Sequence, residues 1–174
     1  MKKLLIALFF LILFCFAGCA KNDKLEQPAS FYYLKTDIDY GTESGVFSSE
    51  ERECKGLSTE EIIGLYLKGP VTEGLKSPFP FNTNLVTLQI TESEISVTLS
   101  DEYAELTGLS LAEANACICQ TLINFTAAER VIISCETKAL NGEARFEFTK
   151  ADMILIDDSI EHADVTSAKE STSN

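Results

Sequence analysis

Histidine, the usual partner of a serine or cysteine nucleophile, occurs once in the 174-residue sequence, as His162. The residues around it, 157–174, are acidic or rich in serine and threonine, a composition typical of a disordered tail. Serine and cysteine nucleophiles most often take their base from histidine, so the predicted domain lacks the partner that such catalysis needs. This argues against the commonest hydrolase mechanisms.

Adjacent carboxylates occur at Glu50-Glu51, Asp101-Glu102 and Asp157-Asp158. A glycosidase needs two carboxyl groups that face each other across a cleft, whereas neighbours in sequence usually form a solvated acidic surface. We therefore predict no catalytic residue and no enzyme, and an envelope hydrolase is the least favoured alternative. Arg52, among three glutamates, either forms a buried pair that ties its strand to the next helix or is solvated.

Two groups of residues have the types of metal ligands without the spacing. Asp37, Asp39 and Glu43 do not match the spacing of the EF-hand calcium loop, and turn formation explains them. Cys117 and Cys119 lack the second cysteine pair and the nearby histidine of a zinc site. The sequence also has no glycine-rich phosphate-binding motif. We predict no metal and no bound cofactor.

Four cysteines lie in the predicted domain: Cys54, Cys117, Cys119 and Cys135. Cys117 and Cys119 are two residues apart on a predicted helix, so they point to different faces and cannot bond each other. Cysteine is readily buried as a small apolar residue, and buried free thiols are the favoured interpretation. A long-range disulfide such as Cys54 to Cys135 is the alternative.

The N-terminus has the pattern of an export signal, predicted to span residues 1–18. Lys2 and Lys3 precede an apolar run from Leu4 to Phe16, which is shorter than the roughly 20 residues of a membrane-spanning helix. A retained signal anchor is the alternative. The run ends in Ala17-Gly18-Cys19, which resembles the lipobox of bacterial lipoproteins. This resemblance implies a diacylglycerol thioether on Cys19 that anchors the chain to the extracytoplasmic side of the cell membrane.

The chain that follows the signal is strongly acidic. Without Lys2 and Lys3, 12 of the 14 basic residues remain beside all 27 acidic ones, a formal charge of −15. Such a surface repels nucleic acid and anionic lipid headgroups, so neither is an expected ligand. Residues 19–30 are polar and contain a proline, as a tether does, and residues 31–156 are long enough for one domain.

Two helices are predicted. Ser58 and Glu61 have the spacing of a capping box, and Gly69-Pro70 marks the end of the helix that follows them. A second capping-box spacing, Ser110 to Glu113, predicts a helix from Ser110 to about residue 126. One apolar stripe of this helix is expected to face a sheet, and it contains Leu111, Ala114, Ile118, Leu122 and Phe125.

Strands are predicted where apolar residues form runs or alternate with polar ones. These segments are 31–38, 46–54, 84–91, 94–99, 129–137 and 144–149. The third and fourth are expected to form a hairpin with one buried face, and Asn141-Gly142 is a strong hairpin turn between the last two. A short apolar run over 153–156 closes the domain.

The loop after the first helix contains Pro78 and Pro80, which restrict its backbone and predict a stiff, extended segment. Phe79 and Phe81 alternate with these prolines. An exposed ridge that contacts another protein is one interpretation of the two rings. Packing of both rings against the domain is the favoured alternative.

Several stretches occur in a characteristic order along residues 31–156. They are Phe31-Tyr32-Tyr33, Glu51-Arg52-Glu53, Leu67-Lys68-Gly69-Pro70, Gly74-Leu75, Ser77-Pro78-Phe79-Pro80, Val97 to Tyr103, Glu113 to Phe125 and Val131-Ile132-Ile133. This order resembles the GerMN domain of sporulation and spore-germination lipoproteins. The resemblance implies a single small α+β domain, similar to ring-building modules of sporulation machinery, with a mixed or antiparallel sheet and two main helices on one face. It also implies no catalytic residues.

These observations predict a noncatalytic lipoprotein that scaffolds protein contacts in the bacterial cell envelope, in sporulation or germination. Other envelope proteins, or a second copy of the chain, are the expected partners. An open sheet edge or the loop of Pro78, Phe79, Pro80 and Phe81 would supply the contact. The alternative is a module that binds a small molecule or a cell-wall fragment in a concave pocket.

Overall fold

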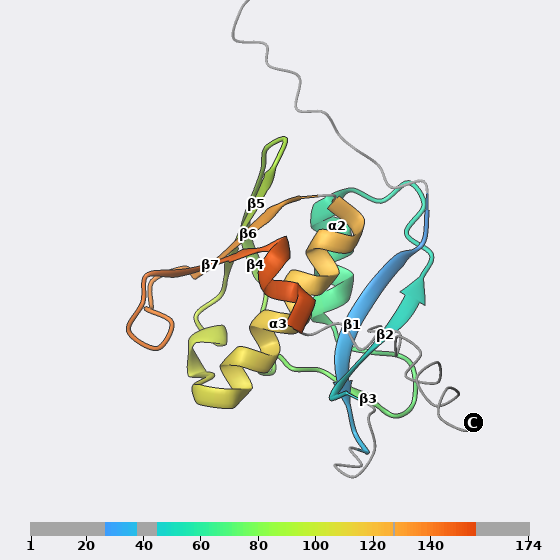
Figure 1. Cartoon of the computed structure of the whole chain (residues 1–174), viewed down its shortest axis with the longest axis horizontal. Helices are drawn as coiled ribbons and strands as arrows, with labels where there is room; N and C mark the ends of the chain where they lie inside the picture. The colour runs from blue at the N-terminus through green and yellow to red at the C-terminus, as the bar shows by residue number, and fades with distance from the viewer. Residues whose placement is uncertain (1–26, 38–44, 127, 156–174) are drawn as a thin grey trace, which may run out of the picture.

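The computed structural model describes residues 27–37, 45–126 and 128–155 (Figure 1). The predicted signal with Cys19, most of the predicted tether, the calcium candidates Asp39 and Glu43, and the predicted tail with His162 lie outside these residues. Within the described ranges the strands form two sheets, one of three strands in the order β2-β1-β3 and one of four in the order β4-β5-β6-β7. The α+β class is confirmed, and the strands divide over two sheets where one was predicted.

The three-stranded sheet is antiparallel and has β1 (Ala29–Lys35) at its centre, between β2 (Phe47–Arg52) and β3 (Leu75–Lys76). β1 begins two residues before the predicted strand, inside the range predicted as tether. Its alternate residues Phe31 and Tyr33 are fully buried. β3 was not predicted, because a strand of two residues is too short to show an alternating pattern.

The four-stranded sheet contains β4 (Leu85–Ile90), β5 (Glu94–Leu99), β6 (Arg130–Cys135) and β7 (Arg145–Thr149). β5 and β6 are parallel, and the other pairs are antiparallel. β5 buries alternate residues as predicted, but β4 has a register shift at Leu85 to Thr87 and exposes Val86 and Ile90. The predicted buried face of this hairpin is therefore interrupted on β4, because a bulge moves the following side chains to other positions.

The turn between β6 and β7 is confirmed at Asn141 and Gly142. Their φ angles are 51° and 89°, and a backbone bridge joins Leu140 to Glu143. Positive φ at both central residues is what a type I′ hairpin turn requires, and asparagine and glycine reach it at low cost.

The first helix, α2 (Thr59–Leu67), has the predicted ends. Ser58 accepts a hydrogen bond from the backbone N–H of Glu61, and the Glu61 side chain accepts one from the backbone N–H of Ser58. Gly69, which follows the C-cap, has a φ of 92°, a conformation that favours glycine at a helix end. The capping box and the C-terminal glycine are confirmed.

The second helix, α3 (Gly108–Thr126), begins earlier than predicted. Ser110 was expected at its start, but Gly108 and residue 109 are already helical. Gly108 has a φ of 54°, which lets the chain turn into the helix two residues before the capping-box serine. The capping-box prediction at Ser110 is therefore wrong.

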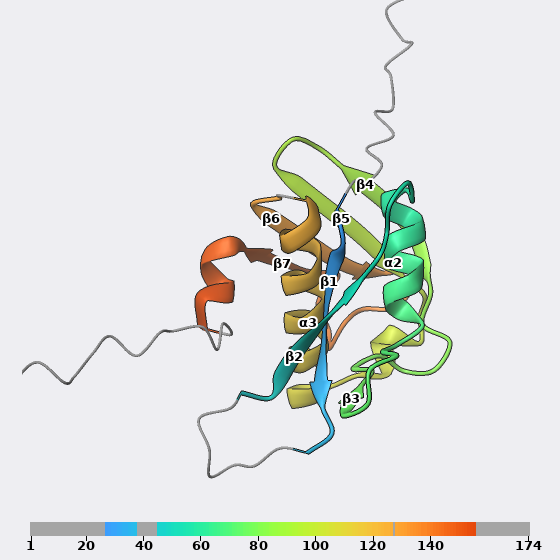
Figure 2. The same cartoon turned by 90° about the vertical axis from the view of Figure 1, so that its right-hand side faces the viewer.

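α3 lies between the two sheets, with β1 on one side and β6 on the other (Figures 1 and 2). α2 and α3 lie on the same side of the four-stranded sheet, as predicted (Figure 1). Because the three-stranded sheet covers the opposite side of α3, the predicted single apolar stripe is too narrow. Buried positions also include Asn115, Ala116, Cys117, Cys119, Thr121 and Ile123.

The last described element, η2 (Lys150–Leu155), is a 3-10 helix that follows β7 and contacts α3. It overlaps the apolar run predicted to close the domain, whose final residue, 156, lies outside the described residues. A shorter 3-10 turn, η1 (Tyr103–Glu105), precedes α3. Tyr103 of this turn is fully buried.

An aromatic cluster centred on Tyr66 of α2 joins the elements. The Tyr66 ring lies 5.4 Å from Phe31, 5.1 Å from Tyr33 and 5.1 Å from Phe79, between ring centroids. The Tyr66 hydroxyl donates to the Tyr32 carbonyl at 2.9 Å, and burial raises its pKa well above the ordinary value, so it stays protonated. The ring contacts and this hydrogen bond fasten α2 to β1.

All four cysteines of the domain, Cys54, Cys117, Cys119 and Cys135, are buried free thiols, as the favoured interpretation expected. Burial raises the pKa of each thiol, to about 11 for Cys135, where the nearby Asp101 carboxylate adds to the effect. A raised pKa leaves little reactive thiolate at neutral pH. These cysteines serve as small core residues.

Candidate interaction surface

A buried ion pair holds the segment that leaves α2. Glu50 of β2, 6% exposed, forms a salt bridge with Arg52, and Arg52 Nε donates to Glu50 Oε1 at 2.6 Å. The Arg52 guanidinium also donates to the carbonyls of Gly69 at 2.6 Å and Leu65 at 3.3 Å. The interpretation of Arg52 as a buried pair that ties its strand to the helix is confirmed.

The Glu50 carboxylate also binds the backbone beyond the helix. It accepts hydrogen bonds from the N–H groups of Val71, at 3.1 Å, and Thr72, at 2.9 Å. Burial alone would raise the pKa of Glu50, but the hydrogen bonds from Thr72, Arg52 and Val71 outweigh it and lower the pKa below the ordinary value. Glu50 is therefore ionised at neutral pH, and it fixes the path of the loop.

Glu50 was not predicted as the partner of Arg52, although the geometry of a strand indicates this pairing. Residues 50 and 52 are two apart on β2, and side chains two apart on a strand point to the same face. The same alternation turns Glu51 to the other face, where it is exposed.

Phe79 lies in the core and is not part of an exposed ridge. It is 8% exposed, and its ring meets Tyr66 edge-on at 83° and lies 6.2 Å from Tyr103, between centroids. Its backbone N–H donates to Ser77 Oγ at 3.1 Å. Phe79 therefore anchors the proline-containing loop to the domain. For this ring, the favoured interpretation of packing against the domain is confirmed.

Phe81, by contrast, is 89% exposed. It follows Pro80 in a turn that is closed by the Thr83 N–H and hydroxyl, which donate to the Pro80 carbonyl at 3.2 and 2.9 Å. Asn82 has a φ of 67°, as the third residue of a type II turn does. The turn presents a large apolar side chain to solvent on a fixed backbone.

Further exposed apolar side chains lie on other elements. Val71 follows α2 in the segment that Glu50 holds, Val86 and Ile90 lie on β4, and Leu109 lies at the start of α3. β4 is also an edge strand of the four-stranded sheet. An edge strand presents unpaired backbone groups that can pair with another chain. The predicted open sheet edge is therefore present at β4.

Of the three adjacent carboxylate pairs, Asp157-Asp158 lies outside the described residues, and each of the other two contains a carboxylate with structural partners. Glu50 pairs with Arg52 as described, and Asp101 accepts hydrogen bonds from the N–H groups of Thr137, at 2.9 Å, and Lys138, at 3.1 Å. In the part of the chain that the structure describes, no three His, Cys, Asp or Glu side chains are grouped so as to hold a metal ion. None of the helices in the same ranges has the length and apolar composition to cross a membrane.

No protein-family model matches the sequence, and the search of curated proteins finds no match. Among solved structures, the chain is similar to the first GerMN domain of the sporulation protein GerM from Bacillus subtilis. The TM-score is 0.50 at 14% identity, over 68% of this chain and 91% of that domain. It is also similar to the tandem GerMN domains of GerM, with a TM-score of 0.51 at 18% identity, over 74% of this chain and 47% of that one.

The two sheets around α3 and the anchored loop define the class of this protein, a small α+β module. Its fold is that of a GerMN domain, as the order of sequence motifs predicted. The chain spans about half the length of the tandem structure, 47%, which contains two such domains.

Proposed function

We propose that the protein is a lipoprotein, anchored at Cys19 to the extracytoplasmic side of a bacterial membrane, whose domain binds another envelope protein without catalysis. The observation that carries this proposal is Phe81, a large apolar side chain held in solvent by a hydrogen-bonded turn. A preorganised aromatic side chain loses little conformational freedom on binding, and such residues often contribute most of the affinity of an interface. The GerMN fold also occurs in the sporulation protein GerM, and this likeness supports a role in sporulation or germination.

In the proposed mechanism, successive segments of the chain have different roles. The diacylglycerol on Cys19 fixes the location, residues 20–28 provide reach, and the domain presents the Phe81 turn. Glu50 and Arg52 hold the start of the loop, and Phe79 holds its middle, so the position of Phe81 is set by the core. Cofactors have no part in this mechanism.

Phe81 is expected to contact the partner directly. A benzophenone amino acid in place of Phe81, in the intact protein in its own cells, should give a discrete crosslinked product after illumination. The same amino acid in place of Leu109, which is 74% exposed on α3, is the matched control and should give little product. In addition, Phe81→Ser should lower capture of that partner by roughly tenfold or more, the loss typical of an aromatic hot spot. Equal crosslinking from both positions would contradict the proposal.

Cys19 is expected to carry the lipid. Cys19→Ser should abolish labelling by radioactive palmitate and shift the protein from the membrane fraction to the soluble fraction, or block its processing. Cys15→Ser is the matched control, because Cys15 is a cysteine of the same segment that the predicted cleavage removes. This variant should keep both label and membrane location. Continued labelling of Cys19→Ser would show that the anchor assignment is wrong.

A further inference from the structure

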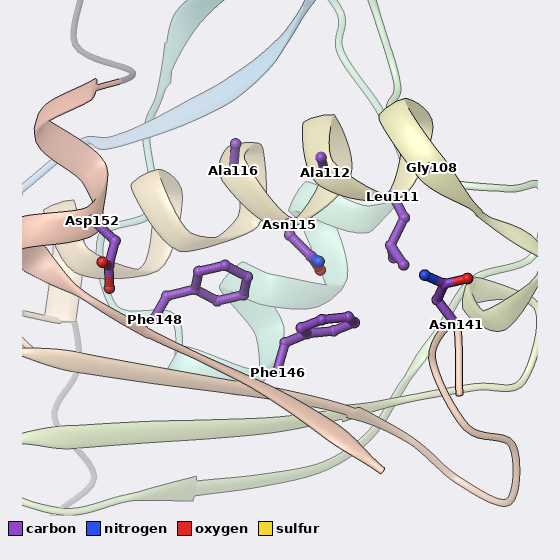
Figure 3. Close-up of a pocket in the computed structure, with 9 residues that line it drawn as sticks. All are labelled: Gly108, Leu111, Ala112, Asn115, Ala116, Asn141, Phe146, Phe148 and Asp152. Carbon is purple, nitrogen blue, oxygen red and sulfur yellow. The ribbon is translucent and has the colours of Figure 1, made fainter. Parts of the chain in front are cut away.

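A cavity of about 360 Å³ lies between the N-terminal half of α3 and strand β7 (Figure 3). Its walls include Leu111, Ala112 and Ala116 of α3 and Phe146 and Phe148 of β7. The volume is at the lower end of the range typical of small-molecule sites. The Phe81 turn contributes no residue to this cavity.

The cavity lies beside β7, an edge strand of the four-stranded sheet. Phe146 and Phe148 are two residues apart, so they point to the same face of β7, toward α3 (Figure 3). Their rings are stacked, with centroids 6.2 Å apart and planes at 28°, and both residues are only partly buried. A flat apolar group can enter beside the two rings and bury them.

Asn115 supplies a directed hydrogen-bond donor inside this apolar space. Its side chain points into the cavity (Figure 3), and the residue is 4% exposed. The buried Tyr103 hydroxyl donates to Asn115 Oδ1 at 2.8 Å, which fixes the orientation of the amide. Within the described residues Asn115 Nδ2 donates to no protein acceptor, and it is open to the solvent of the cavity rather than sealed in the core. A ligand with an acceptor atom would complete this hydrogen bond.

Asp152 is the charged residue among those that line the cavity. Its carboxylate accepts hydrogen bonds from the Thr149 N–H at 2.7 Å and hydroxyl at 2.8 Å, and these lower its pKa, so it is ionised at neutral pH. The whole chain has a formal net charge of −13. Both the local and the overall charge favour a cationic ligand over an anionic one.

We propose that this cavity binds a small aromatic amine, a molecule with a flat apolar ring, an acceptor atom and a cationic end. The ring lies against Phe146 and Phe148, the acceptor atom takes the hydrogen bond from Asn115 Nδ2, and the ammonium group lies toward Asp152. Neither Asn115 nor the two phenylalanines was predicted from the sequence as a binding residue. A single asparagine within a helix and two phenylalanines on a short strand form no sequence pattern that indicates a binding site.

The test uses the full chain in detergent micelles and three probes that share a 4-hydroxyphenyl ring: cationic tyramine, neutral 4-hydroxyphenylacetamide and anionic 4-hydroxyphenylacetate. Saturation-transfer NMR should show tyramine binding with a dissociation constant on the order of 1 mM, as expected for a ligand of this size. The amide should bind more weakly and the acid most weakly. Empty micelles with the same probes give the background.

Two variants locate the site. Ala112→Leu should lower tyramine affinity by roughly tenfold or more, because it fills the cavity from an exposed wall position without disturbing the core. Ala151→Leu, also exposed but outside the cavity, should bind as the wild type does. Asp152→Asn should remove the preference for tyramine over the acid. Absence of binding by all three probes, equal binding of amine and acid, or full binding by Ala112→Leu would overturn the proposal.

Discussion

Replacing Arg52 with methionine should lower the free energy of unfolding by about 3–5 kcal/mol, the usual cost of removing one partner of a buried ion pair. The substitution leaves the Glu50 carboxylate, whose side chain is 4% exposed, without its cation. It also leaves the Gly69 carbonyl without a donor and removes the guanidinium that lies 5.2 Å over the Phe31 ring. Urea unfolding followed by circular dichroism measures the change.

The surface pair of Arg145 and Glu147 provides a matched control. Their nitrogen and oxygen atoms are 2.7 Å apart, close to ideal, but the side chains are 61% and 41% exposed. Arg145→Met should therefore change stability by no more than about 1 kcal/mol. If Arg52→Met and Arg145→Met had the same effect, burial of the first pair would not be what stabilises the loop.

A second substitution separates the charge of Glu50 from its hydrogen bonds. Glu50→Gln keeps an oxygen that can accept from the N–H groups of Val71 and Thr72 but removes the negative charge. In the Arg52→Met background this change removes the uncompensated charge, so the double variant should be more stable than Arg52→Met alone. The gain would show that an unpaired buried charge causes much of the loss.

Features specified by a few neighbouring residues could be predicted from the sequence. The start of α2 depends on Ser58 and Glu61, three residues apart, and the β6 to β7 turn depends on Asn141 and Gly142. In both cases the side chain or the backbone preference acts within one turn of chain. The α+β class followed from such local signals together with the order of the motifs.

The division of the strands into two sheets depends on contacts between residues far apart in the sequence. It could therefore not be predicted from local sequence signals. Thr121 of α3 accepts a hydrogen bond from the N–H of Tyr32 at 2.9 Å, across a separation of 89 residues. A threonine in a helix usually suggests a solvent-facing position, but here the three-stranded sheet covers it. Periodicity identified one buried side of α3, and the other buried positions mix Asn115 and Thr121 with small residues and Ile123, so their apolar signal is weak.

Within the candidate site, identical residue types have opposite environments. Phe79 and Phe81 lie two residues apart, each directly after a proline, in a loop without regular periodicity, so sequence spacing does not show which ring is buried. The backbone conformation determines which ring is buried. The turn at Asn82 directs Phe81 toward solvent, while the Phe79 ring packs against Tyr66 and Tyr103. The loop could therefore be predicted from the sequence, but the different environments of its two aromatic residues could not.

The second large effect is expected at Phe79. Phe79→Ala should lower the free energy of unfolding by about 3–5 kcal/mol, as truncation of a buried phenylalanine usually does. The change leaves a cavity beside Tyr66 and Tyr103 and removes the edge-on contact at 5.1 Å. Because Phe79 holds the loop, the variant should also reduce crosslinking through Phe81, although residue 79 does not itself face the partner.

Phe81→Ala is the control for this experiment, because it removes the same side chain at a position two residues further along the loop. It should change stability by no more than about 0.5 kcal/mol, because its ring is solvated in the folded chain, yet it should reduce partner capture as Phe81→Ser does. Phe79→Leu restores most of the apolar volume, so it should recover much of the stability and, with it, the capture through Phe81. If Phe79→Leu regained stability without regaining capture, the aromatic ring of Phe79 would itself contribute to binding, and the division into a buried anchor and an exposed contact would be incorrect.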